Sequence, residues 1–362
     1  MCHARRAVAV ALLSGECMSV VSSVARASLL LAVPLLALRA QQPVLTEQNA
    51  GTTSLFQAVS VSAINPAVVW ISGHSGTWAR SLNAGATWES HVMAGFDSLQ
   101  FRDLHAIDAN QAWLMAAGIG AKSGIFQTVD GGLSWTQVFT NKDTAAFYDC
   151  MAFWDNSHAF AFSDAVNSRT PIAYTANGAD WSVFTVPALD GEGGFAASGG
   201  CAQTSPAGDA WIATGSAATP RVRHSADRGR TWTDAVLPLA SGSGAGATAV
   251  AFRDARHGIA VGGVIAGSAT GPRAARTIDG GRTWSVITDP SFSGAAYGVA
   301  YTTVRGKFVV VAVGPGGASY SVNDGDTWTL LDSAPYWSVG FGRRGRGWLV
   351  GPKGRVVRLD WR

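Results

Sequence analysis

The chain has 362 residues, and its 27 basic and 24 acidic residues give a formal net charge of +3 at neutral pH. Four of the basic residues and one of the acidic residues lie within residues 1–40, which leaves 23 of each sign in the rest of the chain. A neutral chain offers no net positive field, so we expect neither nucleic acid nor an anionic membrane as its partner.

Residues 1–40 are predicted to form a secretory signal peptide. Arg26 precedes an apolar run at residues 27–38, and Ala40 precedes a polar stretch. A basic start, a short apolar segment and a small residue before the cleavage point are typical of such a peptide. The run is too short to span a membrane. A later start at Met18 preserves all of these features, and both starts predict a secreted or periplasmic protein without a membrane span.

Residues 41–362 are predicted to form a single domain made of repeats. An eight-residue motif, first seen as Ser81-Leu82-Asn83-Ala84-Gly85-Ala86-Thr87-Trp88, occurs five times, and a copy one residue shorter begins at Thr175. The tryptophans that close successive copies are 47, 46, 51, 52 and 44 residues apart. A period of about 40 to 50 residues with one hairpin signature in each period indicates repeated sheets around an axis.

The third position of the motif holds an aspartate or an asparagine, whose side chain can accept hydrogen bonds from the backbone of its own turn. The glycine two residues later permits the positive φ of a tight hairpin. We interpret these acidic and amide residues as structural, because equivalent turns on every repeat cannot all face one site. They are Asn83, Asp130, Asn177, Asp227, Asp279 and Asn323.

The pattern S-x-D-x-G-x-T-W resembles the Asp-box, or BNR repeat, of sialidase-like β-propellers. The resemblance extends from about Phe56 to the C-terminus, and within that superfamily the chain looks most like single-domain bacterial propellers related to the photosystem II stability/assembly factor. The resemblance implies four antiparallel strands in each blade, with the motif between the third and fourth strands. It also implies a non-catalytic platform that binds a protein or a small ligand.

Six repeats carry short apolar runs ahead of the motif, as at residues 56–61. A seventh unit has three such runs and no motif, and an extended segment at residues 43–46 precedes the first repeat. The apolar runs of the seventh unit are at 337–341, 347–351 and 355–359. We therefore predict an all-β, seven-bladed propeller that is closed by the N-terminal strand, since closure removes exposed sheet edges.

Cys150 and Cys201 are the two cysteines outside the predicted signal peptide, and a secreted protein permits a disulfide. They are 51 residues apart, as are the surrounding repeats, so they occupy the same position in neighbouring blades. Equivalent side chains are expected to point the same way round the ring. The sequence therefore leaves two alternatives, a disulfide or two buried thiols.

A concave mouth on the face opposite the motifs is the expected binding surface, since small-molecule sites favour such depressions. The loops on this top face are rich in ionisable and aromatic residues in some blades and consist of glycine, alanine and serine in others. The same charged loops would also suit a solvated surface. The candidate binding residues are Arg102, Asp103, Tyr148, Asp149, Asp164, Arg169, Glu192, Tyr297, Tyr336 and Trp337.

A sialidase-like glycoside hydrolase is the alternative function. It requires two converging carboxyl groups, or a tyrosine with a carboxylate, and Tyr148, Asp149 and Glu192 are possible contributors. The Arg-Ile-Pro signature that precedes the first box in sialidases is absent from residues 74–80. We therefore assign no catalytic residue. Metal-ligand spacings are also absent, so we expect no metal and no cofactor, and a monomer that binds a protein or a carbohydrate ligand.

Overall fold

The computed structural model describes residues 42–267, 270–342 and 345–362. The predicted signal peptide, residues 1–40, and the alternative start at Met18 lie outside these residues. No helix among them is long and apolar enough to cross a membrane. Apart from one 3-10 turn, η1 (Gly120–Lys122), the regular elements in these ranges are strands.

The predicted seven-bladed propeller is confirmed: the strands form seven sheets, each with four antiparallel strands. The first sheet contains β2 (Phe56–Val61), β3 (Val69–Gly73), β4 (Thr77–Ser81) and β5 (Glu89–Val92). The second contains β6 (Phe101–Ala106), β7 (Ala112–Ala116), β8 (Gly124–Thr128) and β9 (Thr136–Thr140). The third contains β10 (Tyr148–Phe153), β11 (Ala159–Ser163), β12 (Arg169–Thr175) and β13 (Trp181–Pro187).

The fourth sheet contains β14 (Ala202–Thr204), β15 (Ala210–Ala213), β16 (Arg221–Ser225) and β17 (Thr233–Val236). The fifth contains β18 (Ala245–Phe252), β19 (Gly258–Val264), β20 (Ala274–Thr277) and β21 (Ser285–Val286). The sixth contains β22 (Gly298–Val304), β23 (Lys307–Gly314), β24 (Gly317–Ser321) and β25 (Thr329–Asp332). The seventh contains β26 (Ser338–Phe341), β27 (Gly347–Val350), β28 (Arg355–Trp361) and β1 (Pro43–Asn49).

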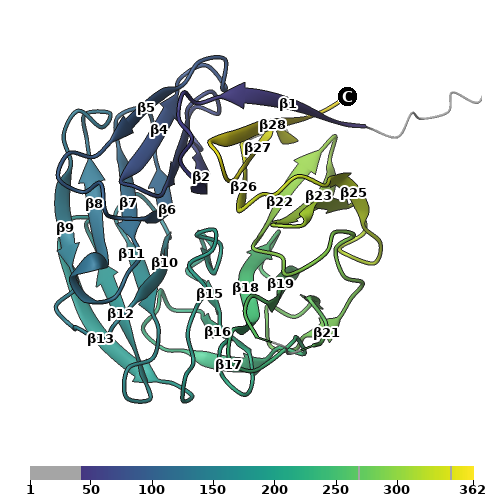
Figure 1. The fold of residues 1–362 in the computed structure, drawn as a ribbon. Coiled ribbons are helices and arrows are strands. Elements are labelled where there is room, and N and C mark those ends of the chain that lie inside the picture. Colours follow the sequence, from purple (N-terminus) through teal and green to yellow (C-terminus); the bar gives the residue numbers. More distant parts are fainter. Residues whose placement is uncertain (1–41, 268–269, 343–344) are drawn as a thin grey trace, which may run out of the picture. The chain divides into compact units, whose positions relative to one another are not determined.

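The sheets are arranged around a common axis, with the first strand of each sheet innermost (Figure 1). In the seventh sheet the outermost position belongs to β1, which pairs with β28 from Pro43 opposite Trp361 to Asn49 opposite Arg355. The first and last strands of the described chain are thus neighbours in one sheet.

Buried tryptophans on the second strands connect the second sheet to the third and the fourth sheet to the fifth. Trp113 on β7 is fully buried and donates its indole N–H to the carbonyl of Gly178, which lies in the third sheet's turn, at 2.9 Å. Trp211 on β15 makes the same bond to Gly280 in the fifth sheet, also at 2.9 Å. Each ring removes a large apolar surface from water and still satisfies its one donor, so the junctions between sheets are rigid.

The six repeated turns share one hydrogen-bond pattern. In the fourth sheet the Ser225 hydroxyl donates to Asp227 at 2.8 Å, and the amide and hydroxyl of Thr231 donate to the same carboxylate at 2.9 and 2.6 Å. Partial burial opposes ionisation, but the hydrogen bonds from Thr231 outweigh it and lower the pKa of Asp227 to about 2. These side chains are occupied within their own turns.

Cys150 and Cys201 form a disulfide, with their Cα atoms 6.1 Å apart. Cys150 lies within β10, next to a bulge at Asp149, whereas Cys201 lies in the turn just before β14. The two backbones therefore differ in conformation, although the repeat spacing makes the positions equivalent. In an ideal ring the two equivalent side chains would point in the same direction. The difference in backbone conformation allows them to face each other instead.

Candidate functional site

Aligning the innermost strands of the seven sheets gives one equivalent position in each sheet, near the start of the strand. We call this set the mouth ring. Its members are Gln57, Arg102, Asp149, Gly200, Thr248, Tyr297 and Trp337. In the first, second, third and fifth sheets the ring residue is a β-bulge, where the pairing with the second strand skips one residue. Bulges re-aim a side chain, and the four residues at these bulges are polar: Gln57, Arg102, Asp149 and Thr248.

The segment between β13 and β14 crosses the channel and closes it. We call residues 189–200 the plug; Figure 1 shows this loop inside the ring, beside β15. The amide of Gln57 donates to the carbonyl of Ala197 at 3.4 Å, and the guanidinium of Arg102 donates to that of Ala196 at 3.4 Å. On the other side, Ser198 donates to the carbonyl of Tyr297 at 2.7 Å. The plug is therefore held by mouth-ring residues from the first, second and sixth sheets.

Above the plug lies a cavity of about 280 Å³, which we call the axial cavity. The lining of this cavity is partly charged and partly aromatic. It includes the guanidinium of Arg102, the imidazole of His74 and the aromatic rings of Tyr297 and Trp337. Tyr297 and Trp337 pack edge to face, with ring centroids 5.3 Å apart. Burial, and then the charge of Arg102, lower the pKa of His74, so its imidazole is neutral at pH 7.

Arg102 has no acidic partner within 4 Å in the described part of the chain. Its Nε donates to Gln100 at 2.9 Å, and burial lowers its pKa although the charge of Asp149 opposes this. A desolvated guanidinium with spare N–H groups is suited to a carboxylate or another planar acceptor. It is the strongest recognition element of the axial cavity.

Asp149 and Asp164 are a hydrogen-bonded pair of carboxyl groups beneath the plug. Burial raises the pKa of both, and mutual repulsion adds to the rise at Asp149. The amide of Gly194 donates to Asp164 at 3.1 Å, and a Cβ placed on Gly194 would lie 2.7 Å from the side chain of Asp149. The backbone of Gly194 thus covers both carboxyl groups and separates them from a ligand.

Glu192 is also occupied within the protein. It is 1% exposed, and it accepts two hydrogen bonds from Arg221 as well as one from Thr214 at 2.8 Å. It fixes one end of the plug to the fourth sheet and offers no free carboxylate to a ligand.

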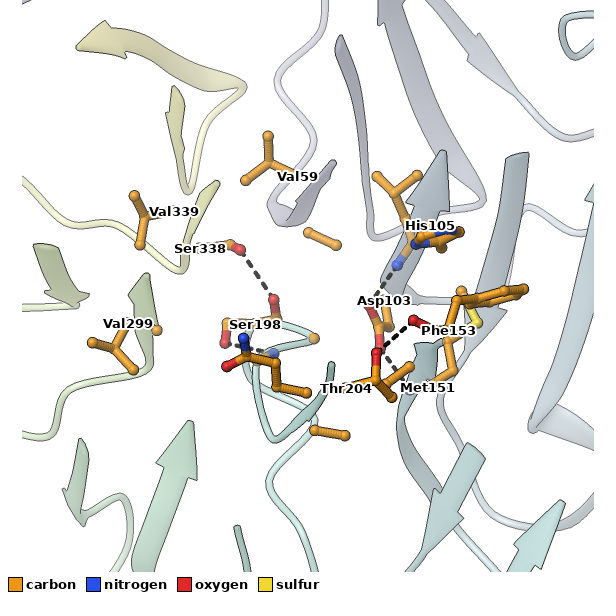
Figure 2. Close-up of a pocket in the computed structure, with 18 residues that line it drawn as sticks. Val59, Asp103, His105, Met151, Phe153, Ser198, Thr204, Val299, Ser338 and Val339 are labelled. Carbon is orange, nitrogen blue, oxygen red and sulfur yellow. Dashed lines mark hydrogen bonds between the residues drawn. The ribbon is translucent and has the colours of Figure 1, made fainter. Parts of the chain in front are cut away.

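Asp103 lies below the plug, in a channel cavity of about 250 Å³ that the innermost strands line. Figure 2 shows Ser198 in the middle of this channel, with Val59, Val299 and Val339 around it and Asp103 on one wall. Asp103 accepts backbone hydrogen bonds from Leu104 and Met151, each at 2.7 Å. Burial outweighs these bonds and raises its pKa to about 8.

Three other predicted site residues lie away from the axis. Tyr148 and Tyr336 each directly precede a mouth-ring residue, as Phe56 and Phe101 do in two other sheets. The rings of both tyrosines are buried between sheets. Arg169 is exposed at the start of β12 and donates to Thr185. Of the ten candidate residues, the axial cavity thus brings together Arg102, Tyr297 and Trp337.

Gln57, His74 and Phe195 also line the axial cavity and were not among the residues predicted from sequence. Gln57 was detectable, because the alignment of innermost strands places it beside Arg102 in the mouth ring. Phe195 was not, since it belongs to the plug, whose path depends on contacts with six sheets. The described residues hold no group of three or more histidine, cysteine, aspartate or glutamate side chains that would suit a metal ion.

Comparison with solved structures finds two forms of one protein. A structure described as YCF48 bound to D1 peptide aligns with a TM-score of 0.62 and 17% identity, over 87% of this chain and 96% of that one. YCF48 from Cyanidioschyzon merolae aligns with a TM-score of 0.59 and 16% identity, over 87% and 98%. The chain has the fold of YCF48.

The Pan2 WD40 domain of Neurospora crassa also aligns, with a TM-score of 0.56 and 10% identity over 84% of this chain and 89% of that domain. At such identities these likenesses show the fold alone. No family model and no curated protein matches the sequence.

Proposed function

We propose that the protein is a secreted or periplasmic binding platform whose axial cavity receives a side chain or chain end of a partner protein. The observation that carries this proposal is the mouth ring. Four sheets contribute Gln57, Arg102, Tyr297 and Trp337 to one depression that the plug closes from below. The site is therefore a shallow socket on one face, which suits docking of an extended segment better than passage through a pore.

The chemistry of the socket favours a peptide with an acidic group beside an apolar one. Arg102 lacks an acidic partner among the described residues and can bind a carboxylate in bidentate fashion. Tyr297 and Trp337 supply a rigid aromatic wall, a feature that hot spots of protein interfaces share. The fold neighbour YCF48 has been solved with a D1 peptide, which supports peptide capture by a propeller of this shape.

Secretion is part of the proposal and is supported by two features. Residues 1–40 have the composition of a signal peptide, and the described chain contains one disulfide, Cys150–Cys201. Disulfides persist in oxidising compartments and are rare in the cytosol.

The glycosidase alternative is less well supported by the geometry. The carboxyl groups that converge, Asp149 and Asp164, are covered by Gly194, and Glu192 is bound to Arg221. A hydrolysis screen against sialosides and aryl glycosides, run on the purified protein beside Asp149→Ala, tests the alternative directly. Turnover that the variant loses would replace the platform with an enzyme.

The platform is tested by selecting peptides from a random display library on the purified protein and measuring each by isothermal titration. We expect selected peptides to carry an acidic residue or a free C-terminus, and to bind Arg102→Ala and Trp337→Ala at least tenfold more weakly. Arg169→Ala, which removes an exposed arginine far from the cavity, is the matched control. Selected peptides that bind all variants equally would place the binding surface elsewhere and refute the proposal.

A further inference from the structure

A second cavity, outside the ring of axial residues, lies between the second and third sheets. Its volume is about 570 Å³, roughly twice that of the axial cavity and within the range of about 300–1,000 Å³ typical of small-molecule sites. It is lined by the outer strand β9, by the loop that follows it, and by β12 and β13. We call it the lateral pocket.

Three aromatic side chains form one wall of the lateral pocket: Phe139, Tyr148 and Trp181. Phe139 meets Tyr148 edge to face at 5.1 Å between centroids and lies 6.2 Å from the ring of Trp181. Tyr148 is fixed by burial, with only 1% of its surface exposed. Tyr148 is therefore held in position by its neighbours before any ligand binds.

Polar atoms in this wall lack partners within the protein. The indole N–H of Trp181 is buried and makes no hydrogen bond in the described structure. Its counterparts in four other repeated turns do donate; Trp232, for example, donates to the carbonyl of Gly229 at 3.0 Å. A buried donor without a partner is costly, so the N–H of Trp181 points to an acceptor supplied from outside. The backbone amide of Tyr148 donates to Ser123, and its hydroxyl makes no hydrogen bond to another described residue.

The rim of the pocket holds two charged side chains on a loop that is tied down. Asn141 donates to the carbonyls of Gly120, Asp143 and Ala146 at 3.0, 3.0 and 3.1 Å, which fixes the loop after β9. Lys142 and Asp143, both exposed, follow on this loop and line the pocket. Burial, and then the charge of Asp143, raise the pKa of Tyr148, so its hydroxyl remains a donor.

We propose that the lateral pocket binds a neutral pyranose sugar, with a ring face on the aromatic wall and its hydroxyl groups between Trp181, Tyr148 and Asp143. A sugar ring has apolar C–H faces and an equatorial belt of groups that both donate and accept. It can therefore cover the aromatic rings, accept from the two unpaired donors and donate to the carboxylate together. A cationic ligand is disfavoured, because it would face Lys142 and two N–H or O–H donors. A purely apolar ligand is disfavoured as well, because it would leave those donors unpaired.

The test is saturation-transfer NMR and isothermal titration of the purified protein with cellobiose, maltose, lactose and N,N′-diacetylchitobiose. We expect at least one of them to bind, and Trp181→Ala and Asp143→Ala to weaken that binding at least tenfold. Asp143 is exposed, so its variant tests the site even if Trp181→Ala fails to fold. Trp181→Phe keeps an aromatic ring and removes the N–H, and we expect an intermediate loss.

Two control variants test whether the sugar binds in the lateral pocket and nowhere else. Trp135→Ala removes the equivalent tryptophan of the second sheet, whose N–H is also buried and unpaired but which does not line the pocket, and should leave sugar binding unchanged. Arg102→Ala should also leave it unchanged, which makes the outcome independent of the proposed peptide socket. The proposal is overturned if none of the four sugars binds, if Asp143→Ala binds as the wild type does, or if Nα-acetyl-arginine amide binds in the sugar's place.

Discussion

Glu192 of the plug and Arg221 of β16 form a two-pronged ion pair, with Nε to Oε1 at 2.9 Å and Nη2 to Oε2 at 2.5 Å. Burial alone would raise the pKa of Glu192, but the hydrogen bonds from Arg221 outweigh it and the pKa is lowered. The pair anchors the plug where it leaves the third sheet.

Replacing Glu192 with glutamine should therefore destabilise the protein by about 3 kcal/mol, because Arg221 then keeps only the partly exposed Asp234, at 2.7 Å, as an acidic partner. The free energy of unfolding in urea measures this. Glu89→Gln is the matched control, since Glu89 is 56% exposed in its 2.9 Å pair with Arg80 and should change stability by less than about 1 kcal/mol. Equal effects of the two substitutions would mean that the plug is not held by this pair.

Asp164→Asn should make stability less sensitive to pH. In the folded protein the pKa of Asp164 is raised to about 6, so the folded state binds more protons than the unfolded state above pH 4. Wild-type stability must therefore fall as the pH rises from about 4 through 6, and the raised pKa of Asp149 extends the loss to higher pH.

An asparagine at this position keeps an acceptor for Gly194 and cannot ionise. We expect Asp164→Asn to exceed the wild type in stability by about 3 kcal/mol at pH 8, at about 1.4 kcal/mol per pKa unit, and to show little gain at pH 4. Urea titrations at pH 4, 6 and 8 decide the matter, with Asp97→Asn as an exposed control. Parallel curves for wild type and variant would contradict the raised pKa of Asp164.

Asp279→Ala should cost about 1–2 kcal/mol, since the carboxylate accepts from Thr277 and from the amide and hydroxyl of Thr283. Asp279→Asn should cost much less, because asparagine occupies the same turn position at Asn83, Asn177 and Asn323. Thermal unfolding of the two variants checks the difference. If asparagine proved as harmful as alanine, the charge and not the hydrogen-bond pattern would be what the turn requires.

Cys150→Ala with Cys201→Ala should lower stability by about 4 kcal/mol, the chain-entropy value for a closed loop of 51 residues. Chemical denaturation of the double variant, beside wild type with and without reductant, measures it. Reductant should shift the wild type toward the variant and leave the variant unchanged. A wild type that reductant does not affect, although free thiols appear, would show that the cross-link adds no stability.

The fold was predictable because its signal is local and repeated. Each copy of the turn, such as Ser225 to Trp232, makes its hydrogen bonds within eight residues, so its sequence is sufficient to specify it. The spacing of the copies then indicates how many sheets surround the axis. None of this depends on contacts between distant residues.

The site was harder to predict, because side-chain direction on the innermost strands depends on β-bulges. Tyr148 and Asp149 are adjacent in sequence and were both expected at the mouth, yet the first faces the lateral pocket and the second lies under the plug. Glu192 was expected to face a ligand, but its partner Arg221 is 29 residues away and could not be paired with it from sequence. Comparing the seven strands position by position would have separated Tyr148 from the mouth.

The pairing of β1 with β28 sets an order of events during folding. Residues 43–49 are made first and residues 355–361 last, and neither strand has its partner until both are present. The seventh sheet therefore cannot be completed before β28 has been synthesised. A chain truncated before residue 355 would leave β1 without its partner, with the unpaired backbone groups of a sheet edge.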